Sequence, residues 1–323
     1  MEILTLTLTQ MAVMFVLMLT GYILKKKKFI PDDSAAVISK LLAFILSPAL
    51  TLSNQITTCT PQLFIENSRL MLYGLITVLI AIGISYPISA LFVRNREKTP
   101  ERAYQRQIYK YALTFGNFGY MGSYIVLGIW GDVMFFKYTM FTFVLNMLVY
   151  AWGIYILVPK SYNSRGIWSN LTSGLLTPPF IALILGIFLG LTGISKYVPG
   201  FITSSLKSAG DCMGPMAMLL AGIVIGEYDF SELLKDKKVY LATLLRLIVI
   251  PAAFVGVLNI LNVNYDIIVI TLIAYATPMG LNTIVFPAAY GGSTKTGASM
   301  TMISSVLSII TIPLMYYIFA ILF

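Results

Sequence analysis

Long apolar runs are the feature that most constrains how this chain folds. The sequence falls into apolar segments of about 20 residues, the length that a helix needs to cross the roughly 30 Å hydrocarbon core of a bilayer. Lipid offers the backbone no hydrogen-bond partners, so a segment that crosses it must satisfy its own N–H and C=O groups as a helix. The sequence therefore predicts an all-α integral membrane protein.

We expect ten transmembrane helices joined by short loops, with no separate soluble module. Their predicted ranges are 5–24, 34–54, 64–93, 108–129, 134–158, 176–195, 202–226, 238–261, 266–290 and 297–321. This count gives a first five-helix repeat at 1–158, a short cytoplasmic linker at 159–175 and a second repeat at 176–323, all within one integrated membrane domain. Because the first half has five spans, an odd number, the sixth helix crosses the membrane in the direction opposite to the first. Two equal halves would therefore be inverted repeats.

Basic residues indicate the orientation of the chain. The loops after helices one, three, five, seven and nine hold 16 of the 22 lysines and arginines, and the opposite loops hold four. Cytoplasmic loops carry such an excess, so we expect a multi-pass protein of the cell membrane with both termini outside. The net charge of +9 then reflects contact with anionic membrane lipid, and no nucleic acid partner is expected.

The composition provides few residues that could form the catalytic or metal site of an enzyme. Histidine is absent, and Cys59 and Cys212 make neither a disulfide framework nor a metal-ligand cluster. An intramembrane enzyme would need an activated nucleophile or a metal, and no motif for either is present. We expect no cofactor, no metal and no catalytic residue.

Helices four and nine are both interrupted near the middle of the membrane. Helix four contains "TFGNFGYMG" with Gly116 and Gly119, and helix nine contains "ATPMGLNT" with Pro278 and Gly280. Each glycine costs about 1 kcal/mol relative to alanine within a helix. Paired interrupted helices in the two halves of a transporter point to its binding site, because a polar substrate or water can bond to the freed backbone.

Polar side chains lie at both interruptions. Asn117 lies in the first, and Asn282 with Thr283 lies in the second. An amide offers a donor and an acceptor without a fixed charge, and the N-terminus of a half-helix attracts a carboxylate. These residues are therefore candidates for binding a small organic anion. In the alternative interpretation, the glycines allow close helix packing and the asparagines bridge helices.

Three other polar residues fall within predicted spans. Asp211 follows Lys207 by four residues, which favours an ion pair, although an intramembrane acid can also be a proton or cation site. Arg246 is expected to extend toward the cytoplasm or pair inside the bundle, with direct substrate contact and ion coupling as the other interpretations. Asn54 either points at the cavity or bonds to a neighbouring helix.

Several motifs resemble those of the auxin efflux carrier family, which includes plant PIN-type exporters and bacterial malate-permease-like proteins. They are "FGNFGYMG", "GPMAMLLAGIVIG" at 214–226, "ATPMGLNTIVFPAAYGG" at 276–292 and the following "SSVLSIITIPL". The resemblance implies a 5+5 inverted repeat in which discontinuous helices four and nine cross beside the substrate, with Asn117 and Asn282 as the crossover asparagines. The long cytoplasmic loop of the plant proteins is replaced here by 159–175, and the break in helix four uses glycine alone.

These observations predict a secondary transporter of small organic anions such as carboxylates, working by alternating access. The family fold implies that helices one, two, six and seven form a scaffold against which the others move. The alternative from another class is a membrane sensor or scaffold that binds a small molecule without moving it. The identity of the anion, the direction, the coupling ion and the choice between a monomer and a homodimer stay open.

The distribution of basic residues makes the topology testable. We expect single cysteine labels at Thr60 or Val263 to react with an impermeant reagent added outside the cell, and labels at Pro100 or Asp236 to react only from the cytoplasm. Labelling of intact and permeabilised cells measures this. The reverse pattern of accessibility would contradict the predicted orientation.

Overall fold

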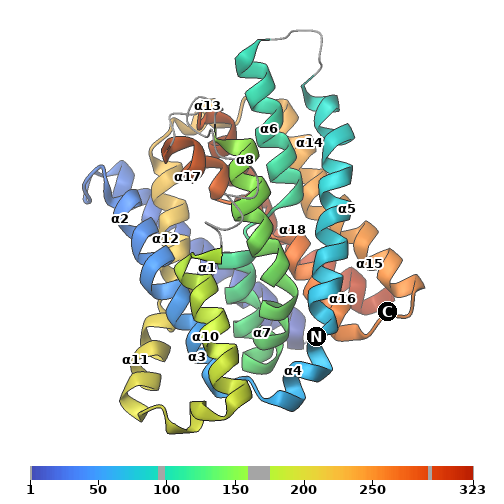
Figure 1. Cartoon of the computed structure of the whole chain (residues 1–323). Helices are drawn as coiled ribbons and strands as arrows, with labels where there is room; N and C mark the ends of the chain where they lie inside the picture. The colour runs from blue at the N-terminus through green and yellow to red at the C-terminus, as the bar shows by residue number, and fades with distance from the viewer. Residues whose placement is uncertain (1, 94–98, 159–174, 290–292, 323) are drawn as a thin grey trace.

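The protein is helical throughout the part that the structure covers. The computed structural model (Figure 1) describes residues 2–93, 99–158, 175–289 and 293–322. These residues form helices and connecting turns, with one isolated β-bridge and no longer strand among them. Nearly all of the predicted cytoplasmic linker at 159–175 lies outside the described residues.

The first part of the chain, up to residue 158, consists of helices joined by short connections. Their bounds are α1 (Glu2–Lys26), α2 (Ser34–Leu41), η1 (Leu42–Leu46), α3 (Ser47–Thr58), α4 (Pro61–Asn67), α5 (Arg69–Phe92), α6 (Pro100–Thr114), η2 (Phe118–Gly122), α7 (Ser123–Leu148), η3 (Val149–Gly153) and α8 (Ile154–Leu157). Within α7 the backbone leaves the helical conformation at Gly131, where φ is 75°. Glycine carries no Cβ and adopts this positive φ without strain, so it allows a sharp bend here.

The second part of the chain is also helical over its described residues. Its elements are α10 (Pro178–Thr192), η4 (Ile194–Tyr197), α11 (Gly200–Asp211), α12 (Met213–Gly226), α13 (Phe230–Leu233), α14 (Lys237–Leu244), η5 (Leu245–Val249), α15 (Ile250–Ile260), α16 (Tyr265–Ala276), α17 (Asn282–Ala289) and α18 (Lys295–Leu322). In Figure 1, α10, α11 and α12 lie beside the early helices α1, α2 and α3, so the two parts of the chain form one bundle.

Seven stretches among the described residues are long and apolar enough to cross a membrane. They are Thr5–Lys26, Ser34–Thr58, Pro61–Phe92, Phe118–Leu157, Gly200–Gly226, Lys237–Ile260 and Lys295–Phe319. The apolar helices α10 and α16 are shorter. These stretches confirm the prediction of an all-helical, multi-pass membrane protein.

Helices α1 and α12 pack with their backbones in contact. A Cβ atom added at Gly21 would collide with the carbonyl oxygen of Leu219, and one added at Gly222 would collide with that of Met18. Glycine therefore allows the close approach of these helices, as small residues commonly do in membrane proteins.

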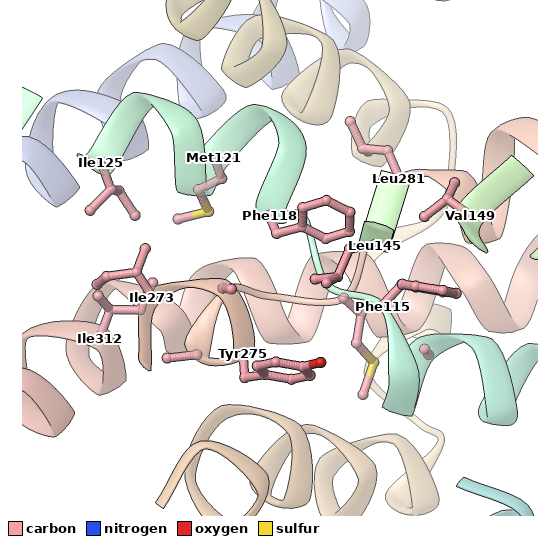
Figure 2. Packing of buried hydrophobic residues seen from close by; sticks show 14 of the residues in the cluster. Phe115, Phe118, Met121, Ile125, Leu145, Val149, Ile273, Tyr275, Leu281 and Ile312 are labelled. Carbon is pink, nitrogen blue, oxygen red and sulfur yellow. The ribbon is translucent and has the colours of Figure 1, made fainter. Parts of the chain in front are cut away.

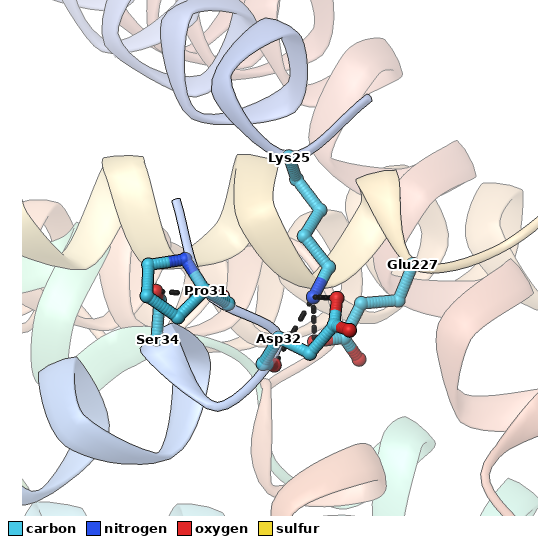
Figure 3. Close-up of polar contacts among 5 residues, drawn as sticks. All are labelled: Lys25, Pro31, Asp32, Ser34 and Glu227. Atoms are coloured by element: carbon cyan, nitrogen blue, oxygen red, sulfur yellow. Dashed lines mark hydrogen bonds and ion pairs between the residues drawn. The ribbon is translucent and has the colours of Figure 1, made fainter. Parts of the chain in front are cut away.

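Ion pairs of Lys25 connect the C-terminal end of α1 to the residue that follows α12 (Figure 3). Lys25 Nζ lies 3.1 Å from Asp32 Oδ1 and 3.6 Å from Glu227 Oε1. Burial raises the pKa of the Glu227 carboxyl above its ordinary value, and the charge of Lys25 lowers that pKa in part. Beside this cluster, Ser34 Oγ donates to Pro31 O at 2.8 Å and shapes the turn before α2.

The hydrophobic core surrounds the two places where helices are interrupted (Figure 2). Phe115 and Phe118 flank the first interruption, with their ring centroids 6.4 Å apart, and Phe115 also lies against Trp152 at 5.9 Å. Tyr275 precedes the second interruption, and Leu281 lies within it. Large buried side chains thus pack against two stretches of non-helical backbone.

Candidate functional site

The two interrupted helices touch each other at their breaks. Helix α6 ends at Thr114 and η2 begins at Phe118, whereas α16 ends at Ala276 and α17 begins at Asn282. Between these ends, Gly116 and Met279 form an antiparallel β-bridge. The breaks predicted at 114–122 and 276–283 are therefore present, and they cross in contact.

Hydrogen bonds satisfy much of the backbone that the breaks free. The N–H of Asn117 donates to Pro278 O at 2.7 Å. The N–H of Met279 donates to Ser304 Oγ at 3.0 Å, and Tyr138 OH donates to Phe118 O at 2.9 Å. A buried polar group without such a partner costs several kcal/mol in a membrane, so these contacts make the crossing possible.

The glycines at the crossing serve different purposes. A Cβ atom at Gly280 would lie 3.0 Å from Gly116 O, and one at Gly116 would lie 2.6 Å from Thr277 Oγ1 and even closer to the guanidinium of Arg246. Both positions therefore require close approach. A Cβ atom at Gly119 would meet nothing within 4 Å.

Arg246 lies fully buried next to the crossing. Its Nη1 atom donates to Leu113 O and Thr114 O, both at 3.3 Å, and its Nη2 atom donates to Ala274 O at 3.4 Å. The guanidinium carbon also lies 5.3 Å from the ring centroid of Tyr275. Of the two locations expected for Arg246, the structure places it inside the bundle.

A cavity lies against the crossing, with a volume of about 120 Å³ open to the centre of a water-sized sphere. Its lining includes the polar residues Ser47, Thr51, Asn117, Tyr120, Ser123, Thr139, Thr142, Asn146, Thr177 and Asn282 and the aromatic residues Phe118, Phe135, Phe143 and Phe180. One water needs roughly 10–15 Å³ by this measure, so the cavity holds several waters or a small organic molecule.

The lining carries no formal charge. Neither lysine, arginine, aspartate nor glutamate is among the described residues that line the cavity. Both η2 and α17 begin at its wall, where helix N-termini carry a partial positive charge. The cavity therefore offers neutral hydrogen-bonding groups and two positive helix ends, a combination that suits an anion.

The two asparagines differ in their contacts. Asn117 lines both this cavity and a smaller pocket beside α1, and its side chain makes no hydrogen bond to the protein within the described part of the chain. Asn282 Nδ2 donates to Tyr111 OH at 3.0 Å. The Asn117 amide is thus free to bind a ligand, whereas the Asn282 amide is partly held by the protein.

Five of the predicted binding residues meet in this cavity. They are Gly116, Asn117, Gly119, Gly280 and Asn282. Two others are buried at the crossing without lining the cavity, and their polar atoms bond to the protein. Pro278 O accepts from the N–H of Asn117, and Thr283 Oγ1 donates to Gly280 O at 2.9 Å.

Asn54 and Asp211 lie elsewhere. Asn54 Nδ2 donates to Asp132 O at 3.1 Å, because α7 meets α3 about one turn beyond the cavity-lining residue Thr51. Of the two interpretations of Asn54, the structure shows the interhelical bond, and Asn54 is not among the residues that line the cavity. Asp211 Oδ1 lies 3.3 Å from Lys207 Nζ, as the four-residue spacing predicted, and it does not line the cavity.

Sequence reasoning considered Asn146 as a residue that could point at the cavity, but it missed the two threonines on the same polar face of α7. Thr139, Thr142 and Asn146 all line the cavity and follow one another by three and four residues. This spacing places them on one face of a helix. The periodic polar positions in an otherwise apolar span were the signal that could have identified this wall.

Comparison with known proteins connects the whole chain to transporters. A family model described as "Membrane transport protein" matches residues 6–169 and 167–316. The chain is 23% identical over 311 residues to the "Uncharacterized transporter YfdV" of Escherichia coli strain K12, and the alignment covers 94% of each chain. The same identity and coverage hold for YfdV of Escherichia coli O157:H7 and of Shigella flexneri.

The geometry predicts different tolerances at two neighbouring glycines. We expect Gly116→Ala to destabilise the protein by about 1–3 kcal/mol, because the added methyl group overlaps Thr277 and Arg246. Gly119→Ala, the matched control, adds the same methyl group to open space and should leave the unfolding temperature nearly unchanged. Thermal unfolding of both purified variants checks this; equal losses would contradict the described packing.

Proposed function

Because the chain belongs to the membrane transport protein family, we propose that it is a secondary transporter that moves small organic anions across the cell membrane by alternating access. The family match agrees with the resemblance to the auxin efflux carrier family. A role as a transporter follows from the family. The anion and the mechanism are inferred from the site.

One observation carries the proposal of an anion. Two helix N-termini meet, together with Asn117, at a cavity whose described lining has no acidic side chain, and the Asn117 amide has no hydrogen-bond partner among the described residues. A carboxylate there gains hydrogen bonds from the amide and attraction from both helix ends. A metal cation would find no carboxylate ligand, so the same cavity disfavours it.

We propose that the described helices form ten spans. In chain order these spans are α1, α2–α3, α4–α5, α6 with the part of α7 before Gly131, the rest of α7 through α8, α10, α11–α12, α14–α15, α16–α17 and α18. The broken helix is the fourth span of each half, and the two breaks pair in antiparallel fashion. Inverted repeats of five spans, 1–158 and 176–323, account for both features.

Contacts between α3 and α7 suggest which side of the cavity is closed. Gln55 Nε2 donates to Thr139 Oγ1 at 3.0 Å, and Asn54 Nδ2 donates to Asp132 O. At another wall, Thr177 and Phe180 begin α10 just after the predicted cytoplasmic linker. We infer that the cavity faces the cytoplasm here, and that alternating access requires the α3–α7 contacts to separate.

The alternative proposal is a membrane sensor or scaffold that binds an organic anion without moving it. It uses the same cavity and the same asparagines. Uptake of labelled carboxylates into proteoliposomes separates the two functions. Saturable flux supports the carrier, whereas binding without flux supports the sensor.

The asparagines provide the direct test of the binding site. We expect Asn117→Ala to lower carboxylate affinity by roughly 10- to 150-fold, because a hydrogen bond to a charged group contributes about 1.5–3 kcal/mol. Its unfolding temperature should change little, since the side chain has no hydrogen-bond partner among the described residues. Asn282→Ala should lower affinity similarly and also lose stability, because it removes the bond to Tyr111.

The decisive measurement is affinity and unfolding temperature on the same purified variants, with a panel of carboxylates. A ligand at 100 times its dissociation constant stabilises the folded protein by about 2.7 kcal/mol, which thermal unfolding detects. Asn146→Ala serves as a control, because Asn146 lines the same cavity from within α7 and not from either interruption. Unstable variants that bind normally would mean that the asparagines only pack helices.

The position of Asp211 bears on coupling. We expect Asp211→Asn to leave the pH dependence of transport unchanged and to shift the unfolding temperature by less than about 2 °C, because an exposed ion pair contributes little stability. Flux measured over a pH series in proteoliposomes tests this. Loss of pH dependence in the variant would instead make Asp211 a proton site.

A further inference from the structure

Two helix C-termini converge on the same buried point. Helix α6 ends at Thr114 and α16 ends at Ala276, and the crossing brings these ends together. The last carbonyls of a helix have no partner within it and carry a partial negative charge equivalent to about half an electron. Two such ends in a low-dielectric interior repel each other unless a cation lies between them.

Arg246 supplies the positive charge at that point. Its guanidinium donates to carbonyl oxygens from both helix ends, Leu113 and Thr114 on one side and Ala274 on the other. Within the part of the chain that the structure describes, no aspartate or glutamate forms an ion pair with it. A buried charge without such a carboxylate is normally very costly. The carbonyls compensate it through Nη1 and Nη2, whereas Nε is buried without a hydrogen-bond partner among the described residues.

The match between the groups is geometric as well as electrostatic. A guanidinium is planar and presents several N–H groups in a fixed fork, so one side chain can bridge oxygens on separate segments. The ring of Tyr275 covers the guanidinium at 5.3 Å and adds a cation–π contact. Gly116 leaves the space that the guanidinium occupies.

We propose that Arg246 is a positioning residue that acts as a covalently attached counter-ion for the C-termini of α6 and α16. It holds these two helix ends together at a point where another protein could bind a metal cation. Helix C-terminal carbonyls coordinate sodium in some transporters, so the oxygens of Leu113, Thr114 and Ala274 resemble a cation site already filled by the protein. It follows that the crossing needs no free cation. It also follows that a variant without the side chain contains a vacant site for guanidinium, sodium or potassium.

The test uses purified Arg246→Ala protein in a buffer whose only cation is N-methylglucamine. We expect its unfolding temperature to fall by roughly 10 °C. Removal of the guanidinium leaves the buried carbonyls at both helix ends without their hydrogen-bond donor. Millimolar guanidinium should restore at least half of this loss, and sodium or potassium a smaller part. The wild-type unfolding temperature should be the same with each cation.

Lys238→Ala is the matched control. Lys238 Nζ also donates to a helix-end carbonyl, Phe92 O at 2.7 Å, but Lys238 is an exposed residue at the start of α14. Guanidinium should not restore this variant, because Lys238 bonds to the carbonyl of a single helix end and does not bridge two of them. Restoration of both variants would indicate a general effect of the additive and would overturn the proposal, as would failure of all three cations to stabilise Arg246→Ala.

A second pair of variants covers the case in which Arg246→Ala does not fold. Arg246→Lys keeps the charge, and Arg246→Met keeps a long side chain without charge. We expect Arg246→Lys to yield monodisperse protein in detergent and Arg246→Met to yield little. Equal yields and equal unfolding temperatures would show that volume alone matters at this position, which would also overturn the proposal. None of these measurements uses an organic anion, so they test the role of Arg246 independently of the proposed transport activity.

Discussion

Every backbone group that leaves a helix inside a bilayer needs another partner, and this requirement governs the centre of the protein. The two interruptions expose N–H and C=O groups where no bulk water competes for them. They are satisfied by each other, through Asn117 and Pro278, and by side chains placed around them, such as Ser304 for Met279. The surrounding helices must therefore bring specific hydroxyl groups to specific positions, which makes the broken helices the most constrained part of the fold.

The crossing also has two electrical poles. The N-termini of η2 and α17 lie at the uncharged cavity, and the C-termini of α6 and α16 lie at Arg246. The partial negative charge of the two helix C-termini is compensated by Arg246. The partial positive charge of the two helix N-termini faces the cavity, which is why the proposed function has an exchangeable anion there.

Local information in the sequence was sufficient for some of these features. Glycine and proline within long apolar runs marked both breaks, and the four-residue spacing of Lys207 and Asp211 predicted their ion pair. The partner of Arg246 and the direction of Asn54 were beyond such reasoning. Each depends on which helix face packs against which neighbour, and side chains far apart along the chain determine that.

The backbone contact between α1 and α12 has a mechanical consequence. With Gly21 and Gly222 pressed against carbonyl groups of the opposite helix, neither helix can slide along the other without first lifting away from it. The salt bridges of Lys25 add a fastening at one end. Helices α1 and α12 therefore move together as one rigid unit. A large rearrangement of the bundle has to occur at interfaces formed by side chains, such as the one between α3 and α7.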